Sequence, residues 1–372
     1  MIMKLFHDIY KGKRVLITGH TGFKGSWLSV WLSELGADII GYALKPSTTP
    51  NLFEISSISK KITSILGDIR DLEKLKSIFK KHKPEIVFHL AAQSLVRYSY
   101  REPVVTFETN VMGTINLLEA CRHSPSVRVI INVTSDKCYE NKGWIWGYRE
   151  NDPMGGYDPY SSSKGCTELI TNAYRNAFFN LQEYGKTHNI ALSSVRAGNI
   201  IGGGDWAEDR LIPDCVKALS KNKKIAIRNP KSTRPWQYVL DPLAGYLLLG
   251  ASMYKDAVKY SGPWNFGPSD DSLLTVKEIV KLVIKHWGNG DFIIEKLRHE
   301  KLRQPHEAKL LKLDASKAYT LLGWKPIYNI YEAVKRTIHW YKEFYYGKRR
   351  EKDIYDSMVG EIMGYSTRLK KK

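Results

Sequence analysis

The chain has 372 residues, of which 43% are hydrophobic and 26% are charged, enough for one large domain or two with a full-sized core. Lys and Arg number 57 against 38 Asp and Glu, a formal charge of +19 at pH 7, which suits nucleic acid, a membrane surface or an anionic small molecule. Because the basic residues are mostly scattered and no nucleic-acid motif occurs, we expect the partner to be an anionic nucleotide and not a nucleic acid. No apolar run is long enough to span a membrane and no signal peptide is recognised, so we expect a cytoplasmic protein without a membrane partner.

The N-terminal region predicts a strand, a glycine turn and a helix. Residues 14–18 are apolar and β-branched, as in a buried strand, and residues 26–32 have helical apolar spacing that ends at Gly36. Between them lies a Gly-x-x-Gly-x-x-Gly pattern made by Gly19, Gly22 and Gly25. Such a turn is typical of dinucleotide binding, because glycines let the backbone approach a pyrophosphate at the helix N-terminus. An ordinary flexible turn is the alternative.

The second strand is expected at residues 38–42. The chain continues from this strand to Lys45 without the acidic residue that usually contacts the ribose of NAD. These residues therefore do not decide between NAD and NADP as the cofactor, and Lys45 could bind the 2′-phosphate of NADP. After a third strand at 62–66, we expect Asp68 at the adenine, and Asp71 as the N-cap of a helix at 72–82.

A fourth strand at 86–90 contains His89, which we expect to be a packed residue. A helix at 104–122 then leads to a fifth strand at 127–133. The carboxyl end of this strand, where ligands bind in open α/β sheets, delivers Thr134, Ser135, Asp136 and Lys137. The location favours a functional role over a surface salt bridge.

Tyr160 and Lys164 lie four residues apart on a helix predicted at 160–177, so they share one face. A neighbouring cation favours the ionised form of tyrosine, which makes Tyr160 a candidate general base for a hydroxyl group. Alternatively, the two side chains lie on the helix surface and have no function.

With a strand at 190–196, the alternation predicts an α/β fold with a Rossmann-type, doubly wound parallel sheet. Beyond Asn199 the alternation breaks down into basic loops suited to a diphosphate, with helices at 242–253, 275–287 and 314–322 and a strand at 292–294. We expect residues 1–196 plus 236–262 to form the dinucleotide-binding domain, 197–235 plus 263–345 a smaller, discontinuous α+β substrate domain, and 346–372 a charged tail that is either a peripheral helix or disordered.

The four cysteines form no Cys-x-x-Cys pair. They are Cys121, Cys138, Cys166 and Cys215. This spacing favours reduced thiols, mostly in the core, over a disulfide or zinc framework, and we expect no metal site.

Residues 18–25, 89–93 and 160–164 together resemble the extended short-chain dehydrogenase/reductase (NAD-dependent epimerase/dehydratase) family. More narrowly, the chain is similar to the CDP-glucose 4,6-dehydratases at residues 134–137, 196–199, 202–206, 234–237 and 306–308. The resemblance covers nearly the whole chain. It implies NAD as cofactor, CDP-glucose as substrate, a place in deoxysugar synthesis for surface polysaccharides such as lipopolysaccharide, and assembly through helices 104–122 and 160–177 into a homodimer or a dimer of dimers.

The resemblance also implies site residues. Cofactor contacts are implied for Gly19, Thr21, Gly22, Phe23, Lys24, Gly25, Asp68, Ile69, Leu90, Ala91, Ala92, Tyr160 and Lys164. Substrate contacts are implied for Asn199, Arg210, Arg234, Gln237, Arg303 and His306.

The implied reaction moves a hydride from C4 of the sugar to NAD and back to C6, with loss of water. Tyr160 takes the 4-hydroxyl proton, Ser135 holds that hydroxyl, and elimination needs a base at C5 and an acid for the leaving hydroxyl. The dTDP-glucose dehydratases carry an Asp-Glu pair here, with Glu as the base, whereas this chain has Asp136 and Lys137. Either neutral Lys137 is the base and Asp136 the acid, or Lys137 stabilises the enolate and another group is the base.

Other functions remain as alternatives. One is UDP-sugar 4-epimerisation on the same fold, but epimerases of this family generally lack an acid/base pair after the fifth strand. Another is 4,6-dehydration of UDP-N-acetylglucosamine, but the enzymes for this reaction usually lack the complete Tyr-x-x-x-Lys. A non-catalytic NAD(P)-sensing protein is disfavoured by the intact Tyr160 and Lys164.

Overall fold

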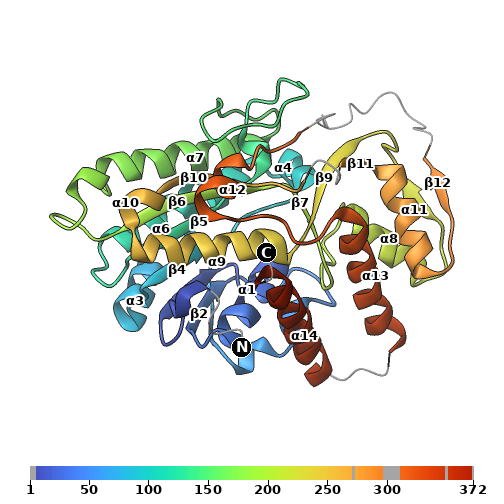
Figure 1. The fold of residues 1–372 in the computed structure, drawn as a ribbon, viewed down its shortest axis with the longest axis horizontal. Helices are drawn as coiled ribbons and strands as arrows, with labels where there is room; N and C mark the ends of the chain where they lie inside the picture. Colours follow the sequence, from blue (N-terminus) through green and yellow to red (C-terminus); the bar gives the residue numbers. More distant parts are fainter. Residues whose placement is uncertain (1–5, 270–272, 296–310, 348–350, 371–372) are drawn as a thin grey trace.

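The computed structural model describes residues 6–269, 273–295, 311–347 and 351–370. Its centre is a seven-stranded sheet with the order β10-β6-β5-β4-β1-β2-β3, in which every pair is parallel (Figure 1). The strands are Arg14–Thr18 (β1), Asp38–Ala43 (β2), Thr63–Leu66 (β3), Ile86–His89 (β4), Val129–Val133 (β5), Ala191–Ala197 (β6) and Gly262–Phe266 (β10). The chain runs outward in both directions from the neighbours β1 and β4, and a sheet of this kind binds ligands outside the carboxyl ends of its strands at this switch point.

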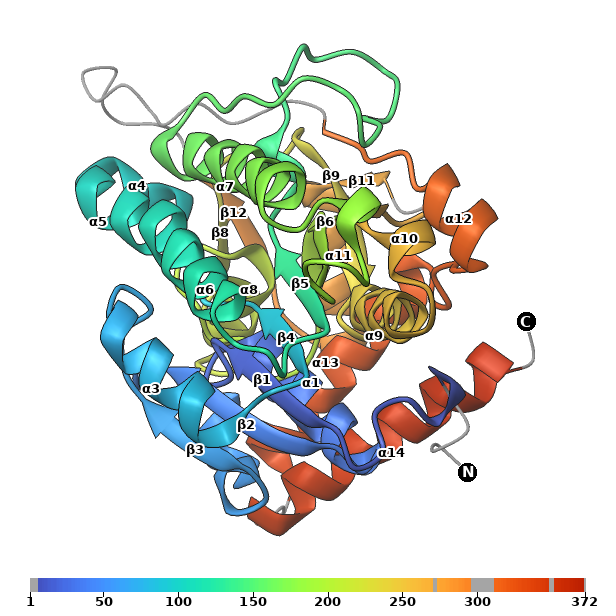
Figure 2. The same cartoon turned by 90° about the vertical axis from the view of Figure 1, so that its left-hand side faces the viewer.

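Helices cover both faces of the sheet (Figure 2). They are Phe23–Glu34 (α1), Leu52–Ile55 (α2), Leu72–His82 (α3), Val96–Arg101 (α4), Pro103–Phe107 (α5), Gly113–Arg122 (α6), Pro159–Ala177 (α7), Leu240–Lys255 (α9) and Ala257–Tyr260 (α10). The helix expected at 104–122 is divided, because a π-helical turn at Glu108–Met112 separates α5 from α6.

The alternation of side chains along β1 explains the two layers. Val15 and Ile17 belong to the core cluster that includes α1 and α9, whereas Leu16 belongs to the cluster that includes α3 and α6. Because both faces are buried, the strand is apolar between Arg14 and Thr18, its end residues. The predicted doubly wound sheet is therefore confirmed.

The smaller sheets stand at one end of the molecule with α8, α11 and α13 (Figure 1). Three strands have the order β11-β9-β7 and two strands pair as β12-β8. These elements are Asn199–Ile201 (β7), Leu211–Leu219 (α8), Ile225–Ile227 (β8), Thr233–Tyr238 (β9), Leu273–Thr275 (β11), Val276–Trp287 (α11), Phe292–Ile294 (β12) and Ile330–Tyr346 (α13). The helix Ser316–Leu322 (α12) lies instead against β10 and α9.

Two expected domain boundaries need correction. Residues 263–266, which we expected in the smaller domain, belong to β10 and pair with β6 of the large sheet. Residues 236–238, which we expected in the dinucleotide-binding domain, belong to β9 and pair with β7 of the three-stranded sheet. The division into two domains otherwise stays a proposal.

The tail contains a long helix, Glu351–Lys370 (α14), which lies against α1 (Figures 1 and 2). Its buried side chains Tyr355 and Tyr365 donate hydrogen bonds of 2.6 Å to Glu34 and 2.8 Å to Asp241. Of the two alternatives for this segment, the structure therefore shows a helix.

No helix in the described ranges is both long enough and apolar enough to cross a membrane. Three of the four cysteines are buried, all but Cys166.

Candidate active site

A cavity of about 680 Å³ lies at the carboxyl end of the large sheet. The glycine turn after β1 and the ends of β2 and β4 line one part, the segment after β5 and the first turns of α7 line the middle, and the smaller sheets close the other part. Residues far apart in the sequence thus share one chamber, as the predictions require.

The glycine turn needs its glycines. Gly19 has a φ of +76°, and a Cβ there would lie 2.7 Å from the backbone nitrogen of Ala91; at Gly25 it would lie 2.1 Å from the oxygen of Gly19. Gly22 is the N-cap of α1, and no side chain caps this end of the helix. The backbone therefore offers a close-packed, uncapped helix N-terminus at the cavity, which suits a pyrophosphate.

The end of the cavity at β2 contains no carboxylate within residues 43–48. Asp68 also lines the cavity, but its carboxylate is held 2.7 Å from Arg70, which is also paired with Glu108. Asp71 caps α3, as predicted, by accepting from the backbone nitrogen of Lys74. The choice between NAD and NADP therefore stays open on geometry.

Tyr160 and Lys164 both line the cavity, and both are buried. Burial raises the pKa of Tyr160 to about 12, although Ser135 and Arg210 act to lower it. Burial lowers the pKa of Lys164 to about 8. The expected lowering of the pKa of Tyr160 is therefore outweighed by burial in this arrangement, in which the Lys164 ammonium donates to the carbonyl of Val133 at 3.4 Å.

The segment after β5 begins a 3-10 turn, Asp136–Cys138 (η4), which is capped by Ser135. Ser135 and Asp136 are buried, Lys137 is half-buried, and all three line the cavity. Burial raises the pKa of Asp136, against the opposing effects of Lys137 and Ser135. The structure thus brings a carboxyl group, an amine and a phenol to one chamber, as acid/base chemistry requires.

Gly198 makes room for this carboxyl group. A Cβ at Gly198 would lie 3.3 Å from Oδ2 of Asp136 and 3.1 Å from Pro235 of β9. The close approach of the two sheets at this point therefore depends on a residue without a side chain.

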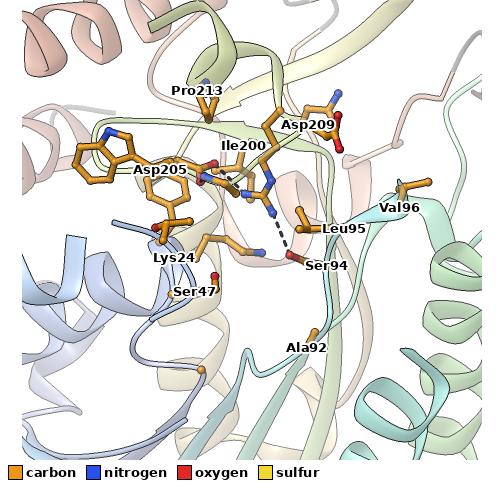
Figure 3. Close-up of a pocket in the computed structure, with 18 of the residues that line it drawn as sticks. Lys24, Ser47, Ala92, Ser94, Leu95, Val96, Ile200, Asp205, Asp209 and Pro213 are labelled. Carbon is orange, nitrogen blue, oxygen red and sulfur yellow. Dashed lines mark hydrogen bonds and ion pairs between the residues drawn. The ribbon is translucent and has the colours of Figure 1, made fainter. Parts of the chain in front are cut away.

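Two cationic side chains, Lys24 and Arg210, also line this cavity. Figure 3 shows Lys24 extending toward Ser94. Arg210 donates to Asp205 at 2.8 Å and to Ser94 at 3.1 Å. Burial lowers the pKa of Lys24 to about 7, and the charges of Lys164 and Arg210 act in the same direction. A cluster of cations that lowers a lysine pKa is suited to an anionic ligand.

Among the predicted substrate residues, Asn199, Arg210 and Arg234 line the cavity. Gln237 does not: it is buried, and its amide nitrogen donates to the carbonyl of Phe266 at 3.0 Å. The reason is strand alternation, since Trp236, its neighbour on β9, is the residue that lines the cavity. Arg303 and His306 lie outside the described residues.

The predicted cofactor residues all line the cavity. His89 is a packed residue, as expected: its ring nitrogens contact Thr18 at 2.7 Å and Thr114 at 3.2 Å. Within the described ranges, no group of three or more His, Cys, Asp or Glu side chains could hold a metal ion.

The sequence did not indicate a cluster of ion-paired residues that lines the cavity. Asp209 lies 3.7 Å from Arg97 and 3.0 Å from Arg228, and all three line the cavity. Only the position of Arg97 shortly after β4 could have indicated it.

Known proteins resemble this chain over most of its length. A family model, GDP-mannose 4,6 dehydratase, matches residues 16–337. A CDP-glucose 4,6-dehydratase of Salmonella typhimurium is 52% identical over 92% of this chain and 94% of its own length, and a dTDP-D-glucose 4,6-dehydratase of Bos taurus is 28% identical over 92% of each.

Solved structures share the fold. A UDP-glucose 4-epimerase from Thermotoga maritima has a TM-score of 0.75 and 24% identity, over 89% of this chain and 99% of that one. A dTDP-glucose 4,6-dehydratase from Bacillus anthracis, in complex with NAD, has a TM-score of 0.73 and 22% identity, over 89% and 97%.

Proposed function

This chain belongs to the GDP-mannose 4,6-dehydratase family, and from that premise we propose that it is a CDP-glucose 4,6-dehydratase, which converts CDP-glucose into CDP-4-keto-6-deoxyglucose and water. The choice of substrate is supported by the Salmonella typhimurium relative, which is far more similar to the chain than the dTDP-glucose dehydratases are. The supporting geometry is the pair Asp136 and Lys137 beside Tyr160 in one cavity, because elimination needs an acid and a base in addition to the single base with which a plain dehydrogenase takes the hydroxyl proton.

NAD is the proposed cofactor, and the residues present fit it. The uncapped N-terminus of α1 and the glycine turn would hold the pyrophosphate, while Asp68, Ala91 and Lys164 line the neighbouring walls. When bound, NAD supplies a hydride acceptor and donor, so that C4 can be oxidised and C6 reduced within one turnover.

Different residues of the chain carry out the separate proton transfers of the proposed reaction. Tyr160 removes the proton from the 4-hydroxyl, which Ser135 orients, and the buried cation Lys164 favours the phenolate. The 4-ketone acidifies the proton at C5, which is taken either by neutral Lys137 or by another base while Lys137 stabilises the enolate. Asp136, with its raised pKa, gives its proton to the departing 6-hydroxyl.

The diphosphate of the substrate is proposed to lie among Arg210, Arg234 and Asn199, whose side chains line the cavity away from the glycine turn. The proposed homodimer or dimer of dimers would use α7 and the helices at 103–122, and the proposed location is the cytoplasm, with a role in deoxysugar synthesis for surface polysaccharide.

A substrate panel tests the function. The protein is mixed with NAD and with CDP-glucose, dTDP-glucose, UDP-glucose or UDP-N-acetylglucosamine, and the base-dependent absorbance of a 4-keto product is followed, with Tyr160→Phe as the matched inactive control. CDP-glucose should turn over at least about 10²-fold faster than the other substrates. Formation of a 4-epimer, preference for a UDP-sugar, or binding of NAD without any turnover would each refute the proposal in favour of a different function.

A further inference from the structure

A buried ion pair that this mechanism does not use lies behind the catalytic segment. Glu168 on α7 and Arg196 on β6 are 4% and 3% exposed, with a nitrogen to oxygen distance of 2.8 Å. Replacing such a pair with well-packed apolar residues is often neutral or stabilising, so stability alone gives no reason for its presence. Its neighbours give another reason.

Both oxygens of Glu168 are saturated with hydrogen bonds. Oε1 accepts from Thr134 at 2.5 Å and from Nε of Arg196 at 2.9 Å. Oε2 accepts from Ser194 at 2.7 Å and from Nη2 of Arg196 at 2.8 Å. The carboxylate is thus fixed in one orientation, in contact with the last residue before Ser135.

Arg196 holds the other end of the same segment. Its Nη1 donates to the hydroxyl of Tyr139 at 2.5 Å and to the carbonyl of Glu150 at 3.0 Å, and its guanidinium lies 4.8 Å from the centre of the Tyr139 ring. Since Thr134 and Tyr139 flank Ser135, Asp136 and Lys137, one ion pair fixes both ends of the segment that carries the acid and the amine.

Glu168 also lies four residues after Lys164, on the same face of α7. The titratable groups that face Lys164 are Tyr160 and Glu168 from α7, Cys138 from η4, Lys24 from α1 and His89 from β4. Burial lowers the pKa of Lys164, and the negative charge of Glu168 is the largest effect that opposes this. Arg196 in turn holds the pKa of Glu168 below its usual range despite burial.

We propose that Glu168 is a positioning residue for the reaction: its carboxylate fixes the segment 134–139 through Thr134 and Arg196, and its charge keeps the neighbouring Lys164 cationic. The role of the segment in turnover rests on the proposed function, whereas the charge coupling between Glu168 and Lys164 does not.

The coupling is tested by NMR titration of lysine side chains labelled with ¹³C, with the Lys164 signal identified by its loss in Lys164→Arg. In the full chain without substrate, the titration midpoint of Lys164 should fall by about one pH unit or more in Glu168→Gln. Glu361→Gln, which removes a carboxylate from the distant Arg336–Glu361 pair, is the matched control and should leave the midpoint unchanged. An unchanged midpoint in Glu168→Gln would overturn the coupling, whatever the substrate of the enzyme.

A second variant covers the case in which Glu168→Gln fails to fold because Arg196 is left buried and unpaired. The double variant Glu168→Gln with Arg196→Gln leaves neither member of the pair unpaired. Its Lys164 midpoint should move in the same direction, though by less, because a positive charge is removed together with the closer negative charge of Glu168. A midpoint that stays in place in the folded double variant counts against the coupling in the same way.

The positioning role is tested with Thr134→Val, which removes one hydrogen bond to Glu168 and keeps every charge. Turnover of CDP-glucose should fall by about 10-fold while the Lys164 midpoint and the KM stay near their wild-type values. In Glu168→Gln, the high-pH limb of the turnover profile should also move to lower pH, in step with the midpoint. Wild-type turnover in Thr134→Val would refute the positioning role.

Discussion

The hydroxyl of Ser135 donates a hydrogen bond of 3.0 Å to the carboxyl group of Asp136, and both side chains are buried. Burial raises the pKa of Asp136 even though this bond and the charge of Lys137 lower it. A carboxyl group with a raised pKa is a better proton donor near neutral pH. The pair therefore joins the residue proposed to orient the 4-hydroxyl to the proposed acid for the 6-hydroxyl.

Asp136→Asn should reduce formation of the 4-keto-6-deoxy product by at least about 10²-fold, since the amide cannot donate a proton as an acid does. It should also stabilise the protein at neutral pH. A carboxyl group whose pKa is higher in the folded than in the unfolded state binds its proton more tightly when folded, so its contribution to stability falls as pH rises.

The increase in melting temperature of Asp136→Asn, on the order of 1–3 °C, should therefore be larger at about pH 7 than near about pH 4, where the carboxyl group is protonated to a large extent in the unfolded chain as well. Thermal melts of both proteins at the two pH values measure this difference. A variant that is stabilised more at the lower pH than at the higher one would show that the pKa of Asp136 is not raised by folding.

Gly19 and Gly12 offer a matched test of the glycine turn. Both have positive φ, +76° and +69°, but a Cβ at Gly19 would collide with the backbone at Ala91, whereas nothing lies within 4 Å at Gly12. Gly12→Ala should therefore cost roughly 1–2 kcal/mol of backbone strain and retain cofactor binding. Gly19→Ala should lose binding of NADH, measured by its fluorescence. Equal affinities in the two variants would argue against a cofactor at this turn.

Met358 and Met363 test the packing of α14. Met358 is fully buried against the core and Met363 is 49% exposed on the same helix. Met358→Ala should lower the free energy of unfolding by about 2–5 kcal/mol, and Met363→Ala should change it by no more than about 0.5 kcal/mol. Urea denaturation of both variants gives the comparison, and equal small losses would mean that the helix does not pack as the structure shows.

Much of the large sheet could be predicted, because its strands are buried on both faces and read as continuous apolar runs such as residues 14–18. The strand at Gly262–Phe266 was missed because Gly262 and Pro263 are poor strand formers, and the strand lies at the edge of the sheet. The three-residue strands β7, β8 and β11 are too short for any periodicity to appear, whereas the equally short β12 could be predicted because all three of its residues favour strands.

The site could be predicted where its motifs are local. Tyr160 and Lys164 share a helix face, and the glycine turn is continuous in the sequence, so both reach the cavity as expected. Gln237 could not be placed, because the side of β9 that faces the cavity depends on pairing with β7 and β11. The raised pKa of Tyr160 likewise depends on burial by segments far away in the sequence.

Lys137→Met should separate the two halves of the reaction. It removes the amine and keeps Tyr160, Lys164 and Ser135, so that oxidation at C4 remains possible while elimination stops. With CDP-glucose, the variant should show the absorbance of enzyme-bound NADH, release no 6-deoxy product, and fail to exchange the C5 hydrogen in deuterated water. If C5 exchange continues at the wild-type rate, Lys137 is neither the base nor the stabiliser of the enolate.

The most direct measurement of the proposed function follows a deuterium label placed at C4 of CDP-glucose. The product of the wild-type enzyme, examined by NMR and mass spectrometry, should carry the deuterium in the 6-methyl group, and no free NADH should accumulate in proportion to product. Deuterium that is found in accumulated NADH, or that remains at C4 of an epimerised sugar, would contradict the account.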